Sequence, residues 1–101
     1  MQDIEALLTQ SEAPVLIDCF SPECKPCAAL APVLEDVASA MGGRMTVEKV
    51  DVVANPDVAR RFGVRGVPTL LLFQRGTLRA TRTGAATRAQ LVTWLAAQQI
   101  T

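Results

Sequence analysis

The sequence of 101 residues predicts an α/β fold with a mixed central sheet of about four strands and helices on both faces. Strand-like and helix-like segments alternate along most of the chain, and strand–helix–strand units imply parallel pairing with right-handed crossovers. The short segment QRGT separates the last two strand-like segments and implies one antiparallel hairpin. Half of the residues are apolar, so we expect one buried core and one domain, residues 1–101.

Strands are expected where short runs of apolar or alternating residues are bounded by turn residues. The first run opens with Pro14, since a missing N–H is tolerated at the first position of a strand. The last run alternates apolar and charged residues, as in a strand with one solvated side. In chain order the expected strands are residues 13–20, 44–52, 69–73 and 78–83.

Helices are expected where apolar residues recur at steps of three and four. The long second helix should be kinked at Pro32, which removes a backbone hydrogen bond, and should stop at the glycines 42–43. The last helix opens with Thr87 and Gln90 in capping-box spacing, and Trp94 is expected in its buried stripe. In chain order the expected helices are residues 3–9, 24–41, 55–63 and 87–99.

Charge and hydropathy exclude several kinds of partner. Ten acidic and ten basic residues give zero net charge, which offers no attraction to nucleic acid or to an anionic membrane. The apolar stretches are shorter than a membrane span, and the N-terminus lacks the basic segment and long apolar core of a secretory signal. We therefore expect a cytoplasmic monomer without nucleic acid or membrane as partners.

The segment SPECKPC, residues 21–27, places two cysteines three positions apart at the start of the long expected helix. A structural disulfide is disfavoured in a reducing compartment, where a close cysteine pair is typical of redox or metal-binding sites. Structural zinc takes four Cys or His ligands, and the chain has three cysteines and no histidine. The pattern favours a redox pair without metal over an inert buried pair or a zinc site shared across a dimer.

The position of the pair predicts different roles for the two thiols. At a helix N-terminus, free N–H groups and the helix dipole stabilise a thiolate at Cys24. Cys27 lies further into the helix on the same face, so it should be more buried and less ionised. We expect Cys24 to attack and Cys27 to resolve. Pro26 suits the first helical turn, while Glu23 and Lys25 tune the redox potential in a direction that the sequence leaves open.

These motifs together resemble the thioredoxin family over almost the whole chain. The matching stretches are PVLIDCF, the CxxC pair, APVLEDVA, VEKVDV, NPDVARRFGVRGVPTLLLF, RGTLRATRTGA and the last helix. The resemblance implies a thioredoxin fold, whose N-terminal edge strand is expected to be missing, and protein-disulfide reduction by thiol–disulfide exchange. It implies disulfide-containing client proteins and a thioredoxin-reductase-type electron donor as partners. It implies no cofactor beyond the redox-active disulfide of the two cysteines.

The resemblance also implies roles for residues outside the cysteine pair. Asp18 matches the buried aspartate that takes the proton of the resolving cysteine, and burial should raise its pKa toward neutrality. Lys49 matches the lysine beside that aspartate. Pro68 matches the cis-proline that faces the disulfide, and Val67 offers main-chain groups to an extended peptide. The small residues that match the partner-docking rim are Gly66, Gly84 and Ala85.

The chain departs from the family pattern at positions around the first cysteine. The residue before it, usually tryptophan, is Glu23, and the residue after it, usually glycine, is Lys25. The aromatic pair after the aspartate becomes Cys19-Phe20, with Cys19 expected as a small core residue. Two alternatives therefore stay open: a specialised redox carrier with a dedicated reductase, and a binding module in which the thiols are incidental.

Overall fold

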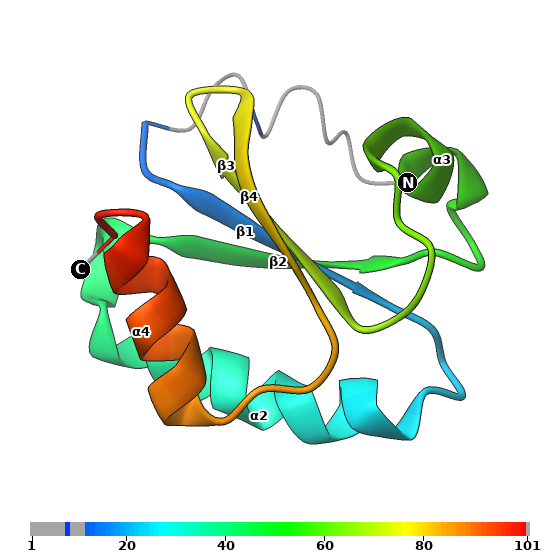
Figure 1. The fold of residues 1–101 in the computed structure, drawn as a ribbon, viewed down its shortest axis with the longest axis horizontal. Helices are drawn as coiled ribbons and strands as arrows, with labels where there is room; N and C mark the ends of the chain where they lie inside the picture. The colour runs from blue at the N-terminus through cyan, green and yellow to red at the C-terminus, as the bar shows by residue number, and fades with distance from the viewer. Residues whose placement is uncertain (1–7, 9–11, 101) are drawn as a thin grey trace.

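The computed structural model describes residue 8 and residues 12–100, which form a four-stranded mixed sheet with helices on both faces (Figure 1). The predicted α/β class is therefore confirmed. The helix expected at residues 3–9 lies outside the described residues, apart from Leu8, which is helical and buried. The described elements are β1 (Val15–Phe20), α2 (Lys25–Ala40), the 3-10 turn η1 (Gly42–Arg44), β2 (Thr46–Asp51), α3 (Pro56–Phe62), β3 (Thr69–Gln74), β4 (Thr77–Thr83) and α4 (Arg88–Ala97).

The sheet has the strand order β2-β1-β3-β4, and only β1 and β2 are parallel. The parallel pairing expected for the unit around α3 was wrong, because β3 runs antiparallel to β1. Length is the physical reason. The seven residues of α3 extend about 10 Å, whereas the six residues of β2 extend about 20 Å. The helix is too short to return the chain to the start of β2, so β3 enters the sheet where β2 ends.

Caps and turn residues set the ends of the helices. Pro26 lies in the first turn of α2, where no helical hydrogen bond is lost, and Pro32 lies inside the same helix. Gly63 ends α3 with a φ of 69°, a left-handed conformation that glycine favours. The predicted capping box of α4 is present, since the N–H of Gln90 donates to the Thr87 hydroxyl (3.1 Å) and the N–H of Thr87 to the Gln90 side chain (2.9 Å).

Two apolar layers pack against the sheet, one on each face. Helices α2 and α4 cover one face, and α3 covers the other (Figure 1). Because side chains alternate along β1, Leu16 and Asp18 face α2, whereas Ile17 and Cys19 face α3. Trp94 is only partly buried at the edge of the α2–α4 layer, which corrects its expected place in the core. The buried residues of α4 are Leu91 and Leu95.

Candidate active site

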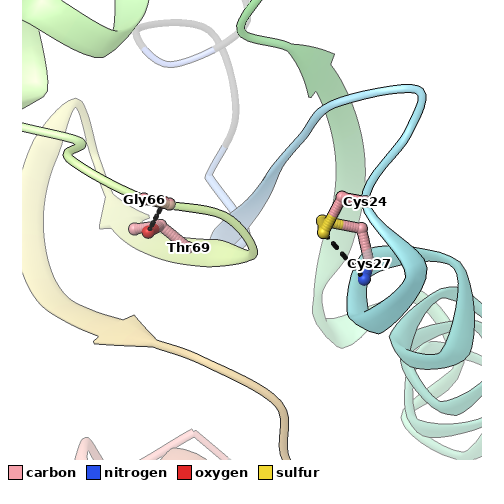
Figure 2. The surroundings of a disulfide bond; sticks show 4 residues. All are labelled: Cys24, Cys27, Gly66 and Thr69. Carbon is pink, nitrogen blue, oxygen red and sulfur yellow. Dashed lines mark hydrogen bonds between the residues drawn. A yellow bond between two sulfur atoms is a disulfide. The ribbon is translucent and has the colours of Figure 1, made fainter.

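Cys24 and Cys27 form a disulfide at the N-terminal end of α2, just beyond the end of β1 (Figure 2). Their Cα atoms are 5.2 Å apart, within the usual range for a disulfide. Cys24 is the N-cap of the helix, and its Sγ accepts a hydrogen bond of 3.1 Å from the N–H of Cys27. The structure thus places this sulfur at the free amides of a helix start, where negative charge is stabilised.

The two cysteines differ in their access to solvent. Cys27 is buried with 4% of its surface exposed, while Cys24 is half-buried. The three neighbours given tuning roles are all exposed: Glu23, Lys25 and Pro26. An incoming disulfide can therefore reach the first sulfur of the pair, and the second is shielded inside the helix.

The loop before β3 faces the disulfide across the site (Figure 2). Its Val67–Pro68 peptide bond is cis, and the carbonyl of Pro68 accepts a hydrogen bond of 2.9 Å from the N–H of Gly84. The hydroxyl of Thr69 donates to the carbonyl of Gly66 at 2.6 Å and closes the loop. Sequence reasoning missed Thr69. The sequence feature that could have indicated it is a hydroxyl-bearing residue at the first position of an otherwise apolar strand.

The rim of this loop is open. A Cβ placed on Gly66 or Gly84 would meet no neighbouring atom within 4 Å, and Ala85 is exposed. Among the main-chain hydrogen bonds of the described residues, none uses the N–H or C=O of Val67. The loop thus presents free peptide groups beside a small-residue surface, which is what an added extended strand requires.

Asp18 is fully buried in the middle of β1, with 0% of its surface exposed. Neither carboxyl oxygen has a hydrogen-bond partner among the described residues. Burial raises the pKa of Asp18, because the charged form loses its water, and the opposing attraction of Lys49 is the weaker effect. Lys49 lies directly opposite Asp18 in the pairing of β1 and β2, but its side chain is exposed.

A small cavity of about 160 Å³ lies beside the disulfide, and Lys49, Cys24 and Cys27 all line it. The ammonium of Lys49 lies 4.8 Å from the centroid of the Phe20 ring, which forms part of the same wall. The other lining residues are Ser21, Pro22 and Ala28. The structure therefore gathers one cation, one aromatic ring and both sulfurs at a single surface.

The third cysteine is not part of this site. Cys19 is buried among apolar residues on the α3 face, so its expected place as a small core residue is confirmed. Burial, together with the nearby charge of Asp18, raises the pKa of the Cys19 thiol to about 12. A thiol in this environment is not ionised near neutral pH and is a poor nucleophile.

Two further properties concern membranes and metals. None of the helices in the described part of the chain has the length and apolar character needed to cross a bilayer. In residue 8 and residues 12–100, no three Cys, His, Asp or Glu side chains are grouped so that they could hold a metal ion.

Comparison with known proteins identifies the family. The family model named Thioredoxin matches residues 2–97. The thioredoxin of Acidithiobacillus ferridurans is 40% identical over 94 residues, covering 93% of this chain and 87% of the relative. The thioredoxin of Pseudomonas aeruginosa is 41% identical over 86 residues, covering 85% and 80%. That of Rhodospirillum rubrum is 38% identical over 88 residues, covering 87% and 85%. With its CxxC disulfide at the start of α2 and its cis-proline loop opposite, the chain belongs to the thioredoxin family.

Proposed function

We propose that this thiol–disulfide oxidoreductase reduces disulfide bonds of client proteins, with Cys24 as the attacking thiol and Cys27 as the resolving thiol. One observation carries this division of roles: Cys24 is half-buried and its Sγ accepts the N–H of Cys27 at the start of α2, while Cys27 itself is buried. In the reduced protein, the same amide and the positive end of the helix dipole favour a thiolate on Cys24.

The exchange proceeds in two steps that transfer two electrons. The Cys24 thiolate first attacks one sulfur of the client disulfide, forms a mixed disulfide and releases the other client sulfur as a thiolate. Cys27 then loses its proton, and its thiolate attacks the sulfur of Cys24. The second client thiolate leaves, and the disulfide of the two cysteines is formed. A reductase of the thioredoxin-reductase type returns this pair to the dithiol, so no metal or bound cofactor enters the reaction.

Asp18 is the general base that we assign to Cys27. It lies on the face of the sheet that α2 covers, and burial raises its pKa above the ordinary value, which makes its carboxylate a stronger proton acceptor. No protein group competes for its oxygens within the described residues. Lys49 supplies a positive charge at the cavity lined by both cysteines, where thiolates form during each step.

We assign binding of the client to the loop opposite the disulfide. An extended client segment can pair with the free main-chain groups of Val67, while Pro68 holds the loop in place through its bond with Gly84. The open surface at Gly66 and Ala85 then lets the client approach without collision. We place this reaction in the cytoplasm, where protein thiols are kept reduced. There the protein would act as an electron carrier between the reductase and its clients.

Reduction of insulin disulfides with dithiothreitol as electron source tests the proposal. The protein should accelerate the reaction, Cys24→Ser should abolish the acceleration, and Cys27→Ser should accumulate the mixed disulfide. Cys19→Ser is the matched control, because this thiol is buried on the opposite face and should be dispensable. Acceleration that survives Cys24→Ser would contradict the assignment.

A specialised carrier with its own reductase is the second candidate. The exposed charges of Glu23 and Lys25 flank Cys24 and favour it, because they replace a neutral contact surface with one that selects partners by charge. Turnover with a general thioredoxin reductase separates the two candidates. Efficient reduction argues for a general thioredoxin. Turnover restored only by Glu23→Trp combined with Lys25→Gly argues for a dedicated partner.

A further inference from the structure

Phe20 and Lys49 make a contact that disulfide exchange does not itself require. The ammonium of Lys49 lies 4.8 Å from the centroid of the Phe20 ring, a distance at which the face of an aromatic ring attracts a cation. Both residues line the cavity that also contains Cys24 and Cys27. The contact therefore holds a positive charge at the wall of the reacting site.

Lys49 lies opposite Asp18 in the strand pairing of β1 and β2, but it forms no hydrogen bond with the carboxyl group of Asp18. Asp18 is paired with Lys49 across β1 and β2, so the two side chains project from the same face of the sheet. Even so, both oxygens of Asp18 are without a hydrogen-bond partner in the described part of the chain. The charge of Lys49 acts on Asp18 only as an attraction that is weaker than the effect of burial.

The difference in burial explains this choice of partner. Asp18 is fully buried, whereas Lys49 is exposed, so an ion pair between them would take the ammonium out of water. Phe20 follows Asp18 by two residues and projects from the same face of β1. Its half-buried ring lets the ammonium keep part of its hydration while it stays beside the two sulfurs.

We propose that Phe20 is a positioning residue whose ring holds the ammonium of Lys49 at the cysteine cavity and away from the carboxyl group of Asp18. The positive charge then supports the thiolate on Cys24, while the carboxyl group of Asp18 is left without an ion pair among the described residues and can accept the proton of Cys27. This inference rests on the proposed function, because it explains why the positive charge of Lys49 acts on Cys24 and not on Asp18, which are two groups of that mechanism. Three other ionisable groups adjoin these residues in sequence or in strand register. The exposed Glu23 and Lys25 flank Cys24, and Asp51 pairs with Phe20 across β1 and β2 while its carboxylate accepts the N–H groups of Val53 and Ala54 at 2.9 and 3.3 Å.

Phe20→Leu is the direct test, with one readout at Asp18 and one at Cys24. Without the ring, Lys49 is free to approach Asp18, so the NMR titration midpoint of the Asp18 carboxyl group should fall. This titration uses the oxidised protein, in which Cys24 and Cys27 do not titrate. In the reduced protein, loss of the nearby cation should make less of Cys24 a thiolate. At pH values below the titration midpoint of this thiol, iodoacetamide should therefore alkylate Cys24 about threefold more slowly than in the wild type.

Two control variants distinguish positioning from general damage. Phe20→Tyr keeps an aromatic ring and should restore both wild-type profiles. Phe62→Leu removes a second half-buried ring, over which the guanidinium carbon of Arg61 lies at 5.0 Å on the α3 side of the sheet. Phe62→Leu should lower the free energy of unfolding about as much as Phe20→Leu does. It should leave the titration of Asp18 and the alkylation of Cys24 unchanged.

A double-mutant cycle decides whether the ring acts through the lysine. In a Lys49→Met background, Phe20→Leu should have no further effect on the alkylation of Cys24. An equal effect in both backgrounds would show that the ring only excludes water, and it would overturn the inference. Lys49→Met alone alters an exposed side chain and should slow alkylation as much as Phe20→Leu, so an unchanged profile would overturn it too. Either failure leaves insulin reduction through Cys24 intact, which separates it from failure of the proposed function.

Discussion

Asp18→Asn should make the protein more stable at neutral pH, although it removes a group from the active site. The carboxyl group is fully buried, and neither of its oxygens has a hydrogen-bond partner among the described residues. Ionising such a group in the folded protein is costly, because the charge loses its water and gains no compensating bond. An amide of nearly the same shape cannot ionise, so it avoids this cost.

The pH dependence follows from the direction of the pKa shift. The pKa of Asp18 is raised by burial above its ordinary value of 3.8, so the folded protein prefers the protonated acid. Its contribution to stability is fully present below pH 3.8 and is lost as the pH rises through the folded-state pKa. At pH 7 the expected gain from Asp18→Asn is about 2 kcal/mol, the order of the cost of a buried polar group that lacks a hydrogen bond. That corresponds to a rise of roughly 10 °C in Tm for a domain of this size.

Thermal unfolding of the oxidised proteins between about pH 3 and pH 8 measures this difference. The two stability curves should converge in acid and separate as the pH rises. Glu35→Gln, which changes an exposed acid of α2, is the control and should show no such separation. A constant gap at all pH values, or a wild type more stable than Asp18→Asn at neutral pH, would refute the account of Asp18.

Three further predictions concern residues around the site and the core. Thr69→Val removes the hydrogen bond to Gly66 and should cost about 1 kcal/mol in denaturant unfolding, with a larger loss in kcat/KM for insulin than Thr69→Ser. Cys19 should resist iodoacetamide at pH 8 in the native protein and react only on unfolding, because its pKa is raised to about 12; labelling in the native state would contradict its burial. Arg88→Gln breaks an exposed ion pair with Asp36 (2.6 Å) and should change the free energy of unfolding by less than about 1 kcal/mol, so a larger loss would mean that this pair fixes α4 on α2.

The local elements could be predicted because local chemistry sets them. The capping box at Thr87 needs only a hydroxyl and an amide three residues apart, and the start of α3 needs only a proline in its first turn. The direction of β3 could not be predicted in the same way. It depends on the span of α3 relative to β2, which the alternation of segment types does not show.

Parts of the site could be predicted where a side chain differs in polarity from the segment around it. Asp18 interrupts an apolar strand and is buried, as the sequence predicted, and the cysteine pair occupies the helix start. The cis bond before Pro68 came from the family resemblance, because few X–Pro bonds are cis and the residues alone do not reveal it. The contact of Lys49 with Phe20 was not predicted, since it depends on how two neighbouring strands align.

The most direct test is the pH dependence of iodoacetamide alkylation at residue 24 in the reduced Cys27→Ser variant. The backbone amide of residue 27 is retained in this variant, so the helix-start environment of the Cys24 sulfur is preserved. We predict alkylation faster than that of free cysteine near neutral pH, with a midpoint below about 8.5, the value for free cysteine. A rate and midpoint equal to those of free cysteine would contradict the claim that this helix start creates the nucleophile.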